Sequence, residues 1–263
     1  MATALLWESG TDGIEVRPGG DGETVLLAYF PPAPDLVASL GTRLAALPSA
    51  RLERVPVPEV DWVARVREGF RAFSCGPFWI APAWEAAAPP SGRLRLIVDP
   101  GRAFGTGTHE TTRLCLSALE EEARTRRPGD RLLDVGTGSG ILAIAAALLG
   151  WRHIAGVDVD PEALESAKVH ARLNRAQAAF VLGDGGAPFR SQSFALVLAN
   201  LTAPLLLARR AELGALLAPG GTLVLSGLLA TDAQDVAAAY APTGSIGTRV
   251  DGEWAALRIR ARP

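Results

Sequence analysis

Beyond residue 93 the chain alternates short apolar runs with longer amphipathic stretches, and this alternation limits the fold more than any other feature. The runs have the length of buried strands, and the stretches between them have helical length and spacing. Strands buried on both faces and joined by helices predict an α/β fold with a doubly wound, mostly parallel sheet. We expect strands at Leu94–Asp99, Arg131–Val135, His153–Asp158, Ala178–Leu182, Phe194–Ala199 and Gly221–Ser226, with helices at about His109–Arg124, Gly140–Leu149, Pro161–Asn174 and Pro204–Leu217.

The last segment predicts an antiparallel end to this sheet. Ser245–Val250 and Trp254–Arg260 both have strand composition, and Asp251-Gly252 between them is a hairpin signal. The sheet is therefore expected to close with an antiparallel strand.

The first ninety residues have a different organisation. Thr24–Phe30 and Arg51–Val57 predict strands, and apolar residues at helical spacing between residues 36 and 47 predict a helix. Asp61–Phe73 predicts a further helix, and Trp84–Gly92 has the composition of a linker. We therefore expect a small α+β domain at residues 1–58, a helical and extended linker at 59–92, and a larger domain at 93–263.

The composition excludes several classes of protein. The 263 residues carry 26 basic and 28 acidic side chains, a formal net charge of −2, so we expect no stable nucleic-acid binding. The longest apolar run, Ile141–Leu149, is far shorter than the roughly 20 residues of a membrane span, so we expect no membrane association. Only Cys75 and Cys115 are present, which predicts a reduced cytoplasmic protein without a metal cluster.

A glycine-rich turn follows the run Arg131–Val135. Gly136, Gly138 and Gly140 allow a tight turn and a close approach of backbone to a ligand at a helix N-terminus. Ile141 stands where a dinucleotide fingerprint has its third glycine, and no Walker lysine follows. A strand-to-helix turn that holds no ligand is the alternative interpretation.

Three acids near the expected strand ends favour a ligand at this turn. Asp134 directly precedes the turn, and Asp158 ends the next strand twenty residues after Gly138, where a carboxylate can accept both hydroxyls of a ribose. Asp184 follows the third strand, where a short polar side chain can reach a purine edge. Because ligands of open α/β sheets bind at the carboxyl ends of the strands, these residues predict a nucleoside-containing ligand.

The loop from Asp99 to Thr112 combines three glycines, four threonines and one aromatic ring. Phe104 can pack on a sulfonium or methylene chain, and the threonine hydroxyls of the loop can bind a carboxylate. For His109 we expect a solvated side chain, with Thr108 as the N-cap of the following helix.

Asn200 follows the fourth strand of the pattern, on the side where a second substrate is expected. Its amide oxygen can accept a hydrogen bond from an amine. The segment Asn200-Leu201-Thr202-Ala203-Pro204 has a single proline and no aromatic ring that could stack on a planar group. The segment therefore favours an aliphatic amine as acceptor.

The glycine turn with Asp134, Asp158 and Asp184 resembles the S-adenosylmethionine site of class I methyltransferases. More specifically, the chain from Asp61 onward resembles the ribosomal protein L11 methyltransferase family. The resemblance rests on IVDPGRAFGTGTHETTRLCL (97–116), LLDVGTGSGILAIAA (132–146), GVDVDPEAL (156–164), VLANLTAPLL (197–206) and GEWAALRIR (252–260).

That resemblance implies an S-adenosylmethionine-dependent enzyme that methylates lysine side chains and the N-terminal amine of ribosomal protein L11, with S-adenosylhomocysteine as product. It implies cofactor contacts at Thr112, Gly136, Asp158 and Asn200, with Phe104 and Thr106 in the same pocket. To these the spacing adds Asp134, Gly138 and Asp184, and Asn200 is expected to act in catalysis by orienting the amine.

The N-terminal part departs from the family pattern. The family's linker carries a D-W-x-x-x-W-K-x-x-F pattern, and in this chain Val66 stands in place of the second tryptophan and Arg67 in place of the lysine. The ferredoxin-like domain that the family carries is expected to be shortened at its start. These departures leave open another protein-lysine target, such as an electron-transfer flavoprotein subunit. A cofactor-binding interaction module without turnover and an RNA methyltransferase are further alternatives.

Overall fold

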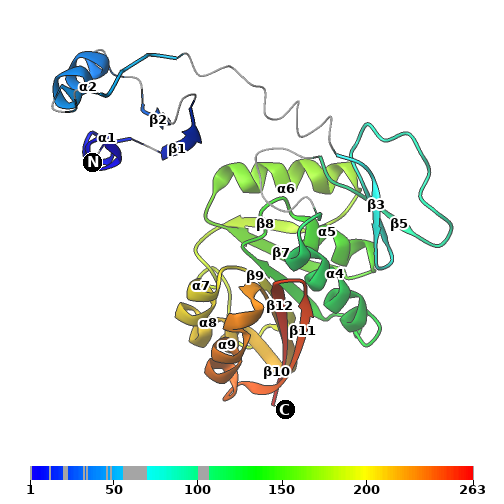
Figure 1. Ribbon diagram of the computed structural model, residues 1–263. Coiled ribbons are helices and arrows are strands. Elements are labelled where there is room, and N and C mark those ends of the chain that lie inside the picture. The colour runs from blue at the N-terminus through cyan, green and yellow to red at the C-terminus, as the bar shows by residue number, and fades with distance from the viewer. Residues whose placement is uncertain are drawn as a thin grey trace. The chain divides into compact units, whose positions relative to one another are not determined.

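The computed structural model describes residues 2–11, 13–19, 23–31, 33, 35–45, 47, 49–55, 70–99 and 107–262 (Figure 1). The chain forms two compact units, Met1–Val60 and Asp61–Pro263. Residues 70–92, part of the expected linker, lie within the second unit. The division into 1–58, 59–92 and 93–263 stays a prediction.

The first unit is a small α+β structure. It contains α1 (Ala2–Glu8), β1 (Gly13–Pro18), β2 (Thr24–Tyr29) and α2 (Leu36–Leu44). The two strands pair antiparallel, from Gly13 opposite Tyr29 to Pro18 opposite Thr24. The strand expected at Arg51–Val57 is wrong for residues 51–55, which form none. Pro56 removes a backbone donor that such a strand needs.

The second unit contains the predicted doubly wound sheet. Its seven strands lie in the order β11-β12-β10-β9-β6-β7-β8, with β10, β9, β6, β7 and β8 parallel and the β11–β12 hairpin antiparallel to its neighbour. The expected C-terminal hairpin is confirmed. The strands are β6 (Arg131–Val135), β7 (His153–Asp158), β8 (Ala179–Leu182), β9 (Phe194–Asn200), β10 (Leu217–Leu229), β11 (Gly244–Asp251) and β12 (Trp254–Ala261).

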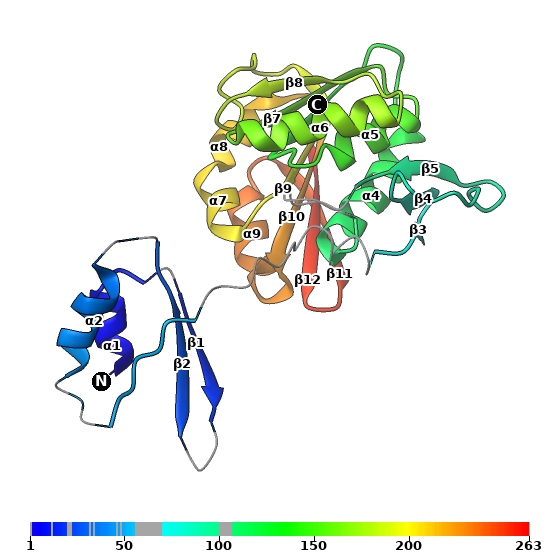
Figure 2. The same ribbon diagram turned by 90° about the horizontal axis from the view of Figure 1, so that it is seen from above.

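Helices cover both faces of this sheet (Figures 1 and 2). Alternate strand residues enter opposite layers, as Leu132 and Leu133 do. One face packs against α4 (Glu110–Ala123), α5 (Ile141–Leu148) and α6 (Pro161–Leu173), and the other against α7 (Ala203–Ala208), α8 (Arg210–Leu216) and α9 (Ala233–Tyr240), with a 3₁₀ turn at Ala230–Asp232.

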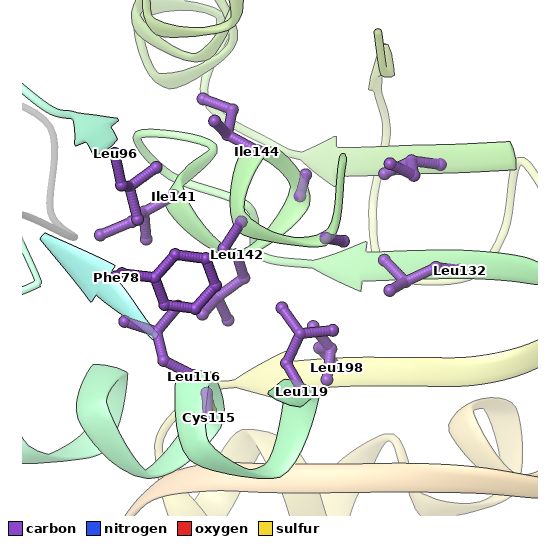
Figure 3. Packing of buried hydrophobic residues seen from close by; sticks show 14 of the residues in the cluster. Phe78, Leu96, Cys115, Leu116, Leu119, Leu132, Ile141, Leu142, Ile144 and Leu198 are labelled. Carbon is purple, nitrogen blue, oxygen red and sulfur yellow. The ribbon is translucent and has the colours of Figure 1, made fainter. Parts of the chain in front are cut away.

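A separate three-stranded sheet lies against the first layer. It consists of β3 (Phe73–Cys75), β4 (Phe78–Ala81) and β5 (Leu94–Ile97). Figure 3 shows Phe78 and Leu96 packed with Leu116 and Ile141 in one buried cluster. The strand expected at Leu94–Asp99 thus exists but belongs to this small sheet, because β5 pairs with β4.

Two helix predictions need correction. The stretch Pro204–Leu217 forms two helices, because the backbone leaves the helical conformation at Arg209. The sequence analysis did not predict α9, because this short helix lacks the long periodic pattern from which helices were predicted. Of the helix expected at Asp61–Phe73, residues 61–69 lie outside the described residues and Phe73 belongs to β3.

Candidate active site

The glycine turn connects β6 to α5 in a backbone conformation that requires glycine. Gly136, Gly138 and Gly140 have φ angles of +71°, +53° and +79°. A Cβ atom at Gly136 would lie 2.6 Å from Leu201 Cδ2, and one at Gly140 would lie 2.9 Å from the Cβ of Ala167. The turn therefore needs glycine both for its dihedral angles and for its close packing.

Asp134 lies beneath this turn. Its side chain is buried, and its Oδ2 accepts a hydrogen bond of 2.7 Å from the Thr137 hydroxyl. Burial raises the pKa of the Asp134 carboxyl to about 6, and the bond from Thr137 opposes this shift. The residue supports the turn from below and is absent from the described lining of the adjacent cavity.

Asp158, at the end of β7, presents an oriented carboxylate. Its Oδ2 accepts a hydrogen bond of 2.9 Å from the Gly138 N–H, and its Oδ1 accepts one of 3.1 Å from the Asp160 N–H. These bonds fix the carboxylate at the cavity wall while each oxygen keeps a further lone pair for a ligand. Asp160 itself caps α6, as the order Asp160-Pro161 suggests.

Asp184 is held by an arginine that the sequence did not suggest. Arg209 forms an ion pair with Asp184 and a second one, of 3.1 Å, with Glu212 Oε2. Glu212 Oε1 also accepts a hydrogen bond from the Gly186 N–H. No sequence motif marks Arg209, because only the packing of α7 and α8 brings it to the end of β8.

A cavity of about 320 Å³ opens at the carboxyl ends of β6, β7 and β9. Of the predicted residues, Thr112, Gly136, Gly138, Asp158, Asp184 and Asn200 line it, whereas Phe104 and Thr106 lie outside the described residues. The remaining lining residues were not predicted from the sequence; they are Val135, Thr137, Ile141, Leu142, Val157, Val159, Gly183, Gly185, Leu201, Leu205 and Arg209.

Thr112 and Asn200 bring polar groups to the cavity from α4 and β9. The Thr112 hydroxyl is buried, yet Oγ1 has no hydrogen-bond partner among the described residues. Because an unpaired buried hydroxyl costs about 1–3 kcal/mol, its position in the cavity wall indicates a missing ligand partner. Asn200 is the last residue of β9, beside Ser226 of β10.

His109 is the N-cap of α4, and Thr108 is not. The ring Nδ1 accepts a hydrogen bond of 3.3 Å from the Thr111 N–H, and the ring lies edge-on to Trp254 with centroids 4.7 Å apart. The expectation of a solvated His109 was therefore wrong, because the C-terminal hairpin brings Trp254 against it.

The cavity fits S-adenosylmethionine by its chemistry. The oriented Asp158 carboxylate suits ribose hydroxyls, the unpaired Thr112 hydroxyl suits a polar end group, and the walls between them include Ile141, Val159 and Leu205. The residues of the described part of the chain form no group of three or more His, Cys, Asp or Glu side chains that could hold a metal ion.

The family model for "Ribosomal protein L11 methyltransferase (PrmA)" matches residues 11–262. This chain belongs to the ribosomal protein L11 methyltransferase family. The match spans both compact units, so membership in this family applies to the first unit as well as to the cofactor domain. The resemblance seen in the sequence motifs is thereby confirmed.

Individual members of the family are similar over most of the chain. The ribosomal protein L11 methyltransferase of Ralstonia nicotianae is 45% identical over 240 residues, 91% of this chain and 74% of the relative. That of Geobacter sulfurreducens is 40% identical over 266 residues, 95% of this chain and 84% of the relative. The crystal structure of the ribosomal protein L11 methylase from Lactobacillus delbrueckii subsp. bulgaricus superposes with a TM-score of 0.67 at 30% identity, covering 74% of this chain and all of that one. These likenesses confirm the class I methyltransferase fold.

Proposed function

We propose that this chain transfers methyl groups from S-adenosylmethionine to amino groups of ribosomal protein L11, on lysine side chains, the N-terminal amine or both. The observation that carries the proposal is the cavity at the carboxyl ends of the strands, with Asn200 in its wall. The names of the relatives supply the substrate, and the acceptor segment supplies the preference for an aliphatic amine.

The proposed chemistry is an in-line displacement. S-adenosylmethionine, when bound, supplies a methyl group on a sulfonium, which is a good leaving group. Asp158 holds the nucleoside end, and the Thr112 hydroxyl binds a polar group of the cofactor. The amide oxygen of Asn200 accepts a hydrogen bond from the incoming neutral amine and aligns its lone pair with the methyl group.

The amine must lose its proton before it attacks. A lysine amine has an unperturbed pKa of about 10.4, and burial beside a positive sulfonium lowers it. We therefore propose that the cavity favours the neutral amine by desolvation, and that Asn200 orients the amine and does not act as its base. A sulfonium leaving group needs no metal.

The three parts of the chain are proposed to have different functions. Residues 1–58 recognise the protein substrate, residues 59–92 connect, and residues 93–263 bind the cofactor. Within the described residues no helix has the length and apolar character of a membrane span, and both cysteines are free. We infer a cytoplasmic location from the proposed ribosomal substrate.

Methyl-labelled S-adenosylmethionine tests the substrate directly. The full chain is incubated separately with purified ribosomal protein L11, ribosomal RNA and a cell extract. We expect label in L11. Label in RNA alone contradicts protein methylation, and label in a different protein of the extract, with none in L11, contradicts the assigned substrate.

Asn200→Ala tests the mechanism. Because the amide oxygen acts on the amine, turnover should fall by roughly 100-fold while the dissociation constant of the cofactor changes by less than about threefold. Ser193→Ala, just before the opposite end of β9, should leave both unchanged. Undiminished turnover in the alanine variant removes Asn200 from the mechanism.

A further inference from the structure

The amino edge of the seven-stranded sheet, where the parallel strands begin, carries a cluster of arginines. Arg131 is the first residue of β6 and pairs with His153, the first residue of β7, and Arg152 directly precedes that strand. Both arginines are exposed. Neighbouring strands lie about 4.8 Å apart, so these cations stand on adjacent strand ends.

The turn between α4 and β6 adds two more arginines. The Nε atom of Arg126 donates a hydrogen bond of 3.4 Å to the Leu149 carbonyl, and its guanidinium lies against Gly150, two residues before Arg152. Arg127 is exposed in the same turn. The four side chains Arg126, Arg127, Arg131 and Arg152 are called the arginine edge below.

The arginine edge is not neutralised by neighbouring acids. None of its four side chains forms an ion pair with any residue in the described part of the chain. Asp130 is the only acid in the segments 126–131 and 149–153, and its Oδ2 accepts a hydrogen bond of 2.7 Å from the Arg127 backbone N–H. Four arginines and one aspartate leave a formal charge of +3. The nearby Arg124, by contrast, is paired with Glu120.

The positive charge continues along the same edge of the sheet. Arg210 and Arg262 line a groove of about 450 Å³ with Gln192, beside the start of β10 and the end of β12. From β7 to β12 the sheet advances by four strand spacings, about 19 Å. A row of this length suits an extended polyanion better than a single small anion.

The composition of the arginine edge favours nucleic acid over protein. None of the exposed large apolar side chains of the described residues lies in segments 124–131 or 149–153. The buried core of a protein–protein interface is usually apolar and poor in charged residues, whereas contacts to a phosphate backbone need only cations and hydrogen-bond donors. We propose that the arginine edge binds the phosphate backbone of a nucleic acid, for which a short RNA serves as the probe.

The arginine edge lies at the opposite edge of the sheet from the cofactor cavity. Asp158 and Asp160 lie at the opposite, carboxyl edge, and Asp184 there is paired with Arg209, so the arginine edge is separated from the cavity by the length of the strands. The net charge of −2 led us to expect no stable nucleic-acid binding, but it is summed over the whole chain and does not exclude a local cluster of positive charge.

Fluorescence anisotropy of the full chain with a short labelled RNA hairpin tests the proposal. We expect binding at about 50 mM salt that weakens linearly in log affinity against log salt. The triple variant Arg126→Gln, Arg127→Gln and Arg152→Gln should bind at least about tenfold more weakly, and its salt slope should fall by about 1 for each phosphate that these arginines neutralise. The matched triple variant with lysine at these positions retains the charge and should keep most of the affinity.

Cofactor affinity, measured on the same preparations, reports whether each variant is folded, and it should be unchanged because the substitutions lie at the opposite edge. A labelled poly-glutamate peptide of similar charge provides the protein arm of the test. The proposal is overturned if the wild-type chain binds no RNA at low salt, if the glutamine and lysine triples bind RNA equally, or if only the peptide binds.

Discussion

Asp134 and Asp158 both lie next to the glycine turn, but their environments differ. Asp158 has its carboxylate fixed by two backbone N–H groups at the cavity wall, whereas Asp134 is buried under the turn against Thr137. Spacing along the sequence singled out both as candidate cofactor contacts. Only their burial, which depends on the packing of α5 over β6, separates the acid at the cavity wall from the one beneath the turn.

Asp158→Asn should weaken S-adenosylmethionine binding by about 10- to 100-fold, because hydrogen bonds to a charged acceptor contribute about 1.5–3 kcal/mol. Titration calorimetry with the cofactor measures this. The matched control is Asp160→Asn, two residues away, which alters the N-cap of α6 and should cost at most about 1 kcal/mol of stability without changing cofactor affinity. Equal losses of affinity in the two variants contradict the role given to Asp158.

Asp134 should make stability depend on pH. Because burial raises the pKa of this carboxyl from 3.8 to about 6, the folded chain binds the proton more tightly than the unfolded chain. Its contribution to the free energy of unfolding therefore falls as pH rises from about 4 to about 6, by on the order of 3 kcal/mol in all. Asp134→Asn removes this dependence, so the stability of the variant relative to wild type should increase with pH over that window.

Denaturant unfolding of both proteins at several pH values between about 4 and 7.5 measures the difference. A constant difference in the free energy of unfolding across this range shows that Asp134 does not titrate there.

Among the elements, α6 forms hydrogen bonds to two segments, the end of β5 and the glycine turn. The buried His170 accepts a hydrogen bond of 3.1 Å from the Asp99 N–H at Nε2, and its Nδ1–H donates one of 3.0 Å to the Ser139 carbonyl in the glycine turn. One turn later, the Asn174 amide pairs with both the N–H and the carbonyl of Ile97. The helix thus holds the end of β5 and the glycine turn in fixed relation.

His170→Ala should lower the free energy of unfolding by about 3 kcal/mol, since it leaves two buried backbone groups unpaired and opens a cavity. It should also weaken cofactor binding, because Ser139 belongs to the glycine turn. Thermal unfolding and calorimetry measure the two effects. Val169→Ala, on the exposed side of the same helix, should change stability by less than about 0.5 kcal/mol, and an unchanged cofactor affinity in the histidine variant contradicts the coupling.

At the scale of the whole molecule the two compact units have different proposed tasks. Among the residues that the structure describes, those lining the cofactor cavity lie between Thr112 and Arg209, all of them in the second unit. Within its described residues the first unit contributes a two-stranded sheet and the helices α1 and α2. Cofactor binding and substrate recognition are therefore expected to be separable.

A chain that begins at Asp61 should bind S-adenosylmethionine within about threefold of the full-length affinity and lose most methylation of ribosomal protein L11. Calorimetry and transfer of a labelled methyl group measure the two properties. Methylation of L11 at the full-length rate by this shortened chain contradicts the recognition role of residues 1–58.

Periodicity and spacing in the sequence sufficed for most strands and helices between β6 and β12, the glycine turn and the acids at the strand ends, but not for β3, β4 or α9. These features are local, because a strand, a helix or a tight turn is specified by residues that are neighbours in the chain. The strand at Leu94–Asp99 shows the limit of this reasoning: its existence was predictable, but its pairing with β4 in a separate sheet was not.

The sequence by itself determined the class of fold, the family and six of the residues that line the cavity. Only the tertiary structure decided that Asp134 is buried, that Arg209 reaches Asp184, that Trp254 packs on His109 and that the arginines gather at one edge. The physical reason is common to all four. Burial and charge environment depend on contacts between residues far apart in the chain, and the folded sheet, not the linear spacing, brings those residues together.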